Sequence, residues 1–318
     1  MNRIAIIGSS GYLVSRLVEH FRGLVAAILG IDVQPPHADA ATQPYEFSGL
    51  DVCDESVGAP FRPDTIIHGA FAFRPLRDEE EIRRVNIDGT RNVLCAVAQI
   101  QPARLLVVSS ATAYGAWPDN PISMDENWPL RARTEFRYAA DKTEVERMVQ
   151  TFARQQPEIA GSTVRPALIG GPHMNNDVSR FIFGMPLLLR LDGEDGTVQF
   201  VHVDDDALVI AAILQANAKG AFKVAPPDWT TVMEIARLTH RLAIQCPLWL
   251  ARWLHGFAGK IRFPIHESAA SFLCFARYPW VVSPSRLANE LGYQFKYSCR
   301  DTLQRIINGS KLGETRST

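Results

Sequence analysis

The chain has few cysteines, almost no net charge and no long apolar run, and each absence excludes a class of protein. Its five cysteines are widely separated and form no Cys-x-x-Cys pair, which argues against a disulfide scaffold or a zinc site. Lys plus Arg total 33 and Asp plus Glu total 34, with no basic run, so we expect no nucleic-acid partner. No apolar stretch approaches the ~20 residues of a membrane span, and residues 4–7 are too short a run for a signal peptide. We therefore expect a cytoplasmic protein with no bound metal and no membrane span.

The first half of the chain alternates short apolar runs with helical patterns. We expect strands at 3–7, 25–31, 65–68, 104–109 and 162–169, and helices at 11–21, 79–100 and 134–153. Continuous apolar strands separated by helices predict a parallel sheet that is covered on both faces. Right-handed crossovers then give an α/β fold with a doubly wound, Rossmann-type parallel sheet.

The second half is less regular. After a turn-rich break, we expect strands at 200–203 and 221–225 and a helix at 204–215, all returning to the same sheet. From Pro226 the chain is mostly helical, and we interpret Trp249, Trp253 and Phe257 as part of a packed helix that lines a pocket rather than a membrane-surface helix. This organisation predicts a nucleotide-binding domain and a smaller, mostly helical C-terminal substrate-binding domain. The first comprises residues 1–170 with 198–225, and the second residues 171–197 and 226–318.

A glycine-rich turn joins the first expected strand to the first expected helix. Gly8 and Gly11 let the backbone approach a pyrophosphate, while Tyr12 and Leu13 open a helix whose N-terminus favours negative charge. Val14 stands where a third glycine is usual in such turns. We therefore expect the helix to lie further from the sheet than glycine would allow.

Asp32 ends the second expected strand, where a carboxylate can accept hydrogen bonds from a ribose diol and would repel a 2′-phosphate. Residues 24–59 contain no Arg or Lys that could pair with such a phosphate. The sequence therefore favours NAD over NADP.

Tyr138 and Lys142 are four residues apart, which places the phenol and the ammonium on one helical face. A phenol with a pKa of about 10 is a poor base at neutral pH, but a nearby cation favours its ionised form. Such a Tyr can exchange a proton with a substrate while a hydride moves. Ser110, at the end of an expected strand, can hydrogen-bond the same substrate oxygen.

With these motifs in order, the chain resembles an extended short-chain dehydrogenase/reductase of the NAD-dependent epimerase/dehydratase family. The matching segments are Gly8-x-x-Gly11, Asp32, Asp51-Val52, 68–72, 86–90, 109–115, Tyr138-x-x-x-Lys142, Arg165-Pro166, 202–205, 283–286 and 290–293. They run through nearly the whole chain.

The resemblance implies a role for each matching residue. Tyr138 would be the acid/base, Lys142 would bind the nicotinamide ribose and lower the pKa of Tyr138, and Ser110 would orient the substrate oxygen. The expected cofactor contacts are Gly8, Gly11, Tyr12, Leu13, Asp32, Asp51 and Val52 at the adenine, Ala70, Ala72, Lys142, and Pro166 at the nicotinamide. Asn86 would lie near the active site. The resemblance also implies a homodimer formed through helices 79–100 and 134–153.

Departures from the family pattern bear on the substrate. Leu168 and Val198-Gln199 stand where sugar-nucleotide epimerases usually carry an Asn and often an Arg, so a diphosphate would lack these partners. Ala111-Thr112 replaces the Asp-Glu pair of nucleotide-sugar dehydratases. Four other arginines, Arg180, Arg190, Arg277 and Arg286, are candidate substitutes. The apolar residues of 181–191 and 247–263 would favour a hydrophobic alcohol or ketone, as in the 3β-hydroxysteroid dehydrogenase branch, although core packing produces the same composition.

Three functions stay open, and we favour them in this order. The first is an NAD-dependent oxidoreductase acting on a small-molecule secondary alcohol or ketone, the second a nucleotide-sugar epimerase that retains NAD, and the third a non-catalytic NAD-binding scaffold.

Two further features of the sequence receive structural rather than functional interpretations. We expect Asp204 and Asp205 beside His202 to cap a helix rather than bind a metal, and Cys95 to be a small core residue.

Overall fold

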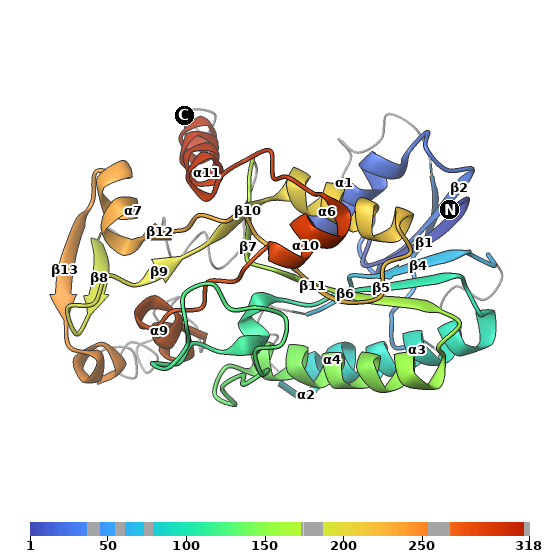
Figure 1. The fold of residues 1–318 in the computed structure, drawn as a ribbon, viewed down its shortest axis with the longest axis horizontal. Helices are drawn as coiled ribbons and strands as arrows, with labels where there is room; N and C mark the ends of the chain where they lie inside the picture. Colours follow the sequence, from blue (N-terminus) through green and yellow to red (C-terminus); the bar gives the residue numbers. More distant parts are fainter. Residues whose placement is uncertain are drawn as a thin grey trace.

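Seven parallel strands form the centre of the fold. The computed structural model describes residues 1–36, 45–54, 61–72, 79–172, 174, 187–253 and 268–314. The strands lie in the order β11-β6-β5-β4-β1-β2-β3 and all neighbours pair in parallel (Figure 1). Their bounds are β1 Arg3–Ile7, β2 Ala27–Ile31, β3 Glu46–Ser48, β4 Thr65–His68, β5 Arg104–Val108, β6 Ala160–Pro166 and β11 Gly220–Val224. The predicted doubly wound α/β sheet is confirmed.

Helices cover both faces of this sheet. On one face α1 (Tyr12–Phe21) packs against α6 (Val203–Gln215), and α10 (Ser285–Leu291) contacts β11. On the other face lie α3 (Gly89–Ile100) and α4 (Arg137–Gln155), as Figure 1 shows. Each face has its own apolar core, so the carboxyl ends of the strands are held rigidly at one edge of the sheet.

The expected helix over 79–100 is interrupted. The structure has α2 at Glu79–Arg83, a π-helical segment at Arg84–Asp88 and then α3. A π-helical turn inserts an extra residue into the helical register and re-aims the side chains it contains. Asn86 and Ile87 in this turn are buried.

Small sheets and helices form the rest of the chain, on the left in Figure 1. The strand at 200–203 was expected in the main sheet, but β10 (Phe200–His202) instead pairs with β7 (Leu168–Gly170), because the chain turns away after Pro166. β11, the other strand expected to return, does pair in the central sheet, beside β6. The other elements are β8 Leu187–Leu191, β9 Thr197–Val198, β12 Thr230–Thr231, α7 Val232–Leu238, β13 Leu242–Cys246, α9 Ser268–Arg277 and α11 Cys299–Glu314, with β8–β13 and β9–β12 paired. The C-terminal region is mainly helical, as expected, while the division into two domains stays a prediction.

Two predictions about burial are wrong. Trp249 and Trp253, expected to pack, are 69% and 61% exposed, and Phe257 lies outside the described residues. Cys95, expected in the core, is exposed because it lies on the outer side of α3, whereas Val93 and Leu94 face inward. Within the described ranges, no helix is long and apolar enough to cross a membrane.

Candidate functional site

The glycine turn between β1 and α1 has a backbone that only glycine adopts easily. Gly8 has φ +83°, and a Cβ there would lie 2.5 Å from the backbone N of Ala70. The Gly8 N–H donates to the Ile31 carbonyl oxygen at 2.7 Å, which fixes the turn on β2. Gly11 is the N-cap of α1 and makes no side-chain capping bond to the first N–H groups of the helix. This cradle fits a pyrophosphate.

Val14 can stand in place of the third glycine because Gly69, on the facing strand end, leaves room for its side chain. Its side chain is buried above Gly69, where an added Cβ would lie 2.5 Å from Val14 Cγ2. The close contact that is usual at the helical glycine is thus made at the residue after β4. A small residue at Gly69 thus faces the large residue at Val14, while the expected displacement of the helix stays a prediction.

Asp32 lies beside the glycine turn. Its carboxylate accepts the Ser10 N–H at 3.0 Å and the Gln34 N–H at 2.9 Å, which leaves lone pairs for a ribose diol. The Tyr12 hydroxyl donates to the Pro172 carbonyl oxygen at 2.9 Å, and the Leu13 side chain belongs to the core. Of Leu13, only the backbone is therefore suited to touch a cofactor.

The remaining residues predicted to contact the cofactor follow strands of the same sheet. Asp51 accepts the Cys53 N–H at 2.9 Å, and Val52 packs on Gly89 at the start of α3. Pro166 ends β6 and is buried, whereas Ala70 and Ala72 follow β4 and are partly exposed. The predicted residues therefore converge from the ends of five strands, β1, β2, β3, β4 and β6, as carboxyl ends of parallel strands must.

Asn86 links the loop after β4 to α4, the helix that carries Tyr138 and Lys142. Its amide oxygen accepts the Ala72 N–H at 2.8 Å, while its amide nitrogen donates to the Ala72 carbonyl oxygen at 3.2 Å and to Asp141 Oδ2 at 3.0 Å. Asp141 immediately precedes Lys142. The π-helical turn thus aims Asn86 at both elements at once.

Ser110, Tyr138 and Lys142 lie together, as the sequence predicts. Ser110 follows β5, and its hydroxyl shares a hydrogen bond with Tyr138. Lys142 Nζ lies 5.7 Å from the centre of the Tyr138 ring and donates to the Val108 carbonyl oxygen at 2.7 Å. Lys142 itself is only 3% exposed.

The proton affinities differ from the expectation that Lys142 lowers the pKa of Tyr138. Burial raises the pKa of Tyr138 to about 12, and the hydrogen bond with Ser110 opposes this only in part. Burial also lowers the pKa of Lys142 to about 7, although Glu146 and Asp141 favour its charge. Burial therefore shifts both groups toward their neutral forms.

His68, at the end of β4, is a neutral neighbour of this group. Thr90 donates its hydroxyl hydrogen to the Asn86 carbonyl oxygen at 2.6 Å, so His68 Nε2, 3.0 Å from that hydroxyl oxygen, must be the donor. Burial and then Lys142 lower the pKa of His68 to about 3.

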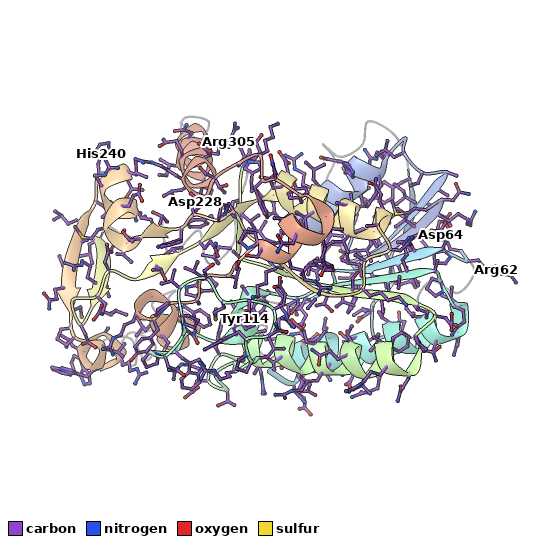
Figure 2. The ribbon with its side chains drawn as sticks, viewed as in Figure 1. Arg62, Asp64, Tyr114, Asp228, His240 and Arg305 are labelled. Carbon is purple, nitrogen blue, oxygen red and sulfur yellow. The ribbon has the colours of Figure 1, made fainter. Side chains whose placement is uncertain are left out.

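A buried ion pair behind the site was not predicted from the sequence. Arg165 Nε lies 2.8 Å from Glu146 Oε1, and that oxygen also accepts the Ser109 hydroxyl hydrogen at 2.6 Å. Arg165 also donates to Tyr114, which Figure 2 labels between the sheet and α4. Burial opposes the charge of Arg165, but Glu146 and Tyr114 together raise its pKa. The available signal was the position of Glu146, four residues after Lys142 on the same helical face.

The polar groups considered as diphosphate partners are engaged elsewhere. Gln199 donates to the Pro226 carbonyl oxygen at 2.8 Å and accepts the Val282 N–H at 3.0 Å, and Leu168 packs against the core. Arg190 donates to the Gly193 carbonyl oxygen at 2.6 Å and Arg277 pairs with Asp192 at 2.8 Å. Arg286 pairs with Glu290 at 2.8 Å, while Arg180 lies outside the described residues.

We expected Asp204 and Asp205 to cap α6, and this expectation is wrong. His202 is the N-cap, because its Nδ1 accepts the Asp204 N–H at 3.2 Å. Asp205 instead accepts the N–H groups of Lys296 and Tyr297 at 3.0 and 2.9 Å, so it holds the segment before α11. Asp204 stands in the first helical turn, where negative charge is favoured.

A family model described as "NAD dependent epimerase/dehydratase family" matches residues 4–225, which contain the glycine turn, the central sheet and the Ser110–Tyr138–Lys142 group. The chain belongs to this family. Its cofactor is NAD, and the turn at Gly8, the N-terminus of α1 and Asp32 fit that cofactor. The chain is thus an NAD-dependent enzyme of the epimerase/dehydratase family.

Relatives within and around this family have varied activities. An uncharacterised protein of Mycobacterium tuberculosis is 23% identical over 311 residues, covering 95% of this chain and 81% of the relative. The sterol-4-alpha-carboxylate 3-dehydrogenase (decarboxylating) of Candida albicans is 29% identical, covering 96% of this chain and 85% of the relative. The crystal structure of UDP-glucose 4-epimerase from Thermotoga maritima with UDP-glucose has a TM-score of 0.76 at 15% identity, covering 98% of this chain and 99% of that one. This structural likeness confirms the fold.

Proposed function

We propose that the protein is an NAD-dependent oxidoreductase that transfers a hydride at a secondary alcohol or ketone carbon. The observation that carries this proposal is the grouping of Ser110, Tyr138 and Lys142 at the carboxyl edge of the sheet. Gly8, Gly11, the backbone of Tyr12 and Leu13, Asp32, Asp51 and Val52 would hold the adenosine and pyrophosphate. Ala70, Ala72, Lys142 and Pro166 would hold the nicotinamide end.

The proton affinities of the site suit this chemistry. NAD, when bound, supplies the hydride acceptor, or in its reduced form the hydride donor. In the direction of reduction, neutral Tyr138 gives its proton to the carbonyl oxygen, which Ser110 also hydrogen-bonds. In the direction of oxidation, Tyr138 must first be ionised, and protonated Lys142 favours that phenolate. Because the pKa of Lys142 is about 7, both proton states of Lys142 are accessible near neutral pH.

The engaged arginines favour an apolar substrate over a nucleotide sugar. A diphosphate needs a fork of donors, yet Arg190, Arg277 and Arg286 already bind carbonyl or carboxylate oxygens of this chain. The Candida albicans relative is a sterol dehydrogenase and a Streptomyces relative, 27% identical over 241 residues, is a reductase. We propose that residues 171–197 and 226–318 form the region that selects a hydrophobic substrate.

The second candidate is a nucleotide-sugar epimerase that retains its cofactor. Its support is the similarity in fold to UDP-glucose 4-epimerases, including that of Thermus thermophilus in complex with NAD, with a TM-score of 0.72 at 20% identity. In that case hydride would return to the opposite face of the substrate carbon. No net NADH would then be released.

Absorbance of NADH separates these candidates. The purified protein is incubated with NAD and a panel of secondary alcohols, including sterols, and in parallel with UDP-glucose and UDP-galactose. We expect net NADH with an apolar alcohol, and Tyr138→Phe should abolish it while Tyr297→Phe, which also removes a phenolic hydroxyl, should not. Interconversion of the UDP-sugars without net NADH would establish the epimerase instead.

Calorimetric titration tests the cofactor contacts. We expect NAD to bind far more tightly than NADP to protein that absorbance shows to be cofactor-free, and Asp32→Ala to reduce the preference. Equal binding of the two cofactors to the unmodified protein would contradict the role proposed for Asp32. No binding of either would favour a scaffold that has lost its cofactor site.

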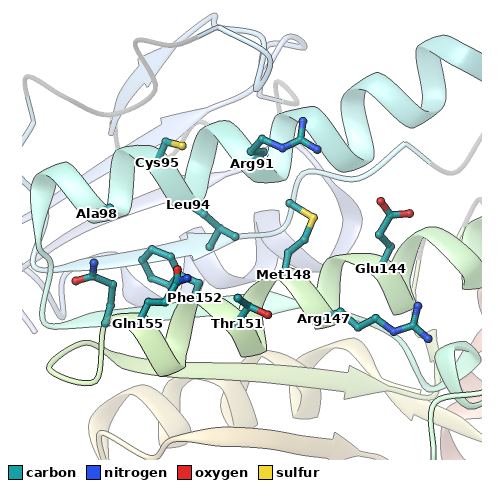
Figure 3. A pocket seen from close by; sticks show the side chains of 11 residues that line it. Arg91, Leu94, Cys95, Ala98, Glu144, Arg147, Met148, Thr151, Phe152 and Gln155 are labelled. Carbon is teal, nitrogen blue, oxygen red and sulfur yellow. The ribbon is translucent and has the colours of Figure 1, made fainter.

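We also propose that the protein forms a homodimer through α3 and α4. A groove between these helices is lined by Leu94, Met148 and Phe152 together with Arg91 and Glu144 (Figure 3). A groove with both apolar and charged side chains is suited to pair with a second copy of itself. Light scattering should give the dimer mass, and Met148→Glu should give the monomer while Met233→Glu, at an exposed position on α7, should not.

A further inference from the structure

Phe71 has an unusual place beside the candidate catalytic residues. It lies between Ala70 and Ala72, in the loop after β4 that we propose lines the cofactor. The centre of its ring is 3.6 Å from Lys142 Nζ, and its plane meets the Tyr138 ring edge-on at 5.3 Å and 87°. One side chain thus covers the ammonium and contacts the phenol.

The contact with Lys142 competes with any other group that needs the same ammonium. Lys142 donates to the Val108 carbonyl oxygen on one side, and the π-face of Phe71 covers it on another. Among the described residues, the charged or titratable groups near Lys142 are Tyr138, Asp141 and Glu146 on its own helix and neutral His68 on β4. None of these groups lies in the loop after β4, which carries Phe71.

We propose that Phe71 is a gating residue for NAD: its ring occupies the face of Lys142 that a ribose hydroxyl needs, and it must swing away when the cofactor binds. This inference rests on the proposed role of Lys142 in holding the nicotinamide ribose. Asn86 restrains the backbone of the next residue, Ala72, through two hydrogen bonds, so a rotation of the Phe71 side chain is sufficient and the loop can stay in place.

The gate has a measurable consequence for affinity. A cofactor that must displace a stacked ring binds only to the fraction of molecules in which the ring is away, so its apparent affinity is reduced by that fraction. Removing the ring should tighten NAD binding. We expect about a tenfold gain for Phe71→Ala, the order expected for one partly desolvated cation–π contact. Phe71→Leu, the matched control, keeps apolar bulk without the π-face and should fall between the two.

Calorimetry with NAD on cofactor-free protein measures these affinities. A second measurement uses the unmodified sequence labelled with 4-fluorophenylalanine, in which the fluorine resonance missing from Phe71→Leu identifies Phe71. We expect saturating NAD to shift this resonance strongly, because the ring leaves the ammonium. This signal reports on the intact sequence even where a variant folds poorly.

Three results would overturn the gate. They are weaker NAD binding to Phe71→Ala, NAD binding without a shift of the Phe71 resonance, and no NAD binding to either the unmodified protein or Phe71→Ala. Failure of the proposed oxidoreductase function is distinguishable, because it appears as NAD binding without turnover of any alcohol. Tighter binding to Phe71→Ala together with a shifted resonance would support the gate whichever substrate is used.

Discussion

Replacing Gly69 with alanine tests whether the space that Val14 needs is provided by the sheet. The new Cβ would lie 2.5 Å from Val14 Cγ2, well inside van der Waals contact. Such overpacking costs ~1–3 kcal/mol, while the lost freedom of the unfolded chain returns ~0.4–1 kcal/mol because Gly69 has no positive φ. We therefore expect Gly69→Ala to lower the free energy of unfolding by about 1–2 kcal/mol.

A second substitution, at Val14, isolates the contact between Val14 and residue 69. In a Val14→Ala background the clashing methyl groups are absent, so Gly69→Ala should cost nothing and gain a few tenths of a kcal/mol. The coupling between the two positions in a double-mutant cycle is then about 2 kcal/mol. Gly161→Ala is the matched control, since a Cβ there would meet Ala153 Cβ at an ordinary 3.5 Å.

Urea unfolding followed by circular dichroism gives the four free energies, provided that the slopes agree. NAD affinity should fall with Gly69→Ala and recover in the double variant, because α1 carries the pyrophosphate cradle. If Gly69→Ala costs the same in both backgrounds, or no more than Gly161→Ala, the reasoning about Val14 is refuted.

Three further changes test buried ionisable groups. The pKa of His68 is about 3 in the folded protein against 6.5 when unfolded, so the unfolded state takes up the proton first as pH falls. The free energy of unfolding should therefore decrease by about 3 kcal/mol between pH 7 and pH 4. His68→Asn should remove this dependence on pH in urea unfolding experiments. Burial raises the pKa of Asp206, whose carboxylate oxygens have no hydrogen-bond partner among the described residues, so stability falls as pH rises above the unfolded value and Asp206→Leu should raise the melting temperature at pH 8 more than at pH 4. Glu146→Gln leaves Arg165 as an unbalanced buried charge and should lower the unfolding free energy by ~3–5 kcal/mol.

Each of these has a contrary outcome. An unchanged acid slope in His68→Asn would mean that other groups govern acid unfolding. Equal effects of Asp206→Leu at both pH values would show that Asp206 does not titrate in this range. A cost for Glu146→Gln no greater than for Glu144→Gln, on the surface of the same helix, would show that the ion pair contributes little.

The sequence was sufficient for elements whose signal is local. The apolar run at residues 3–7, the glycine turn after it and the Tyr138–Lys142 spacing each determine structure within a few residues, and the structure has them where expected. The sequence was insufficient where the outcome depends on contacts between distant segments. Gly69 lies 55 positions after Val14, and neither residue alone indicates that it accommodates the other.

Similar limits explain the errors in burial and in proton affinity. The 3.6-residue periodicity over 79–100 could not reveal the π-helical turn, because that turn is stabilised by the tertiary contacts of Asn86. The apolar character of Trp249 suggested packing, yet exposure depends on which elements cover it. The expected lowering of the pKa of Tyr138 considered the charge of Lys142 and omitted desolvation, which has the largest effect on this phenol.

The Ser109–Glu146–Arg165 ion pair has a consequence for how this enzyme can be altered. Each of its members is a short step along the chain from a proposed site residue: Ser109 precedes Ser110, Arg165 precedes Pro166, and Glu146 lies one turn beyond Lys142. The segments that carry Ser110, Lys142 and Pro166 are therefore held together by this buried group of contacts. Because β8 and β13 form a separate two-stranded sheet, we expect changes within that sheet to leave the relative positions of Ser110, Lys142 and Pro166 unchanged.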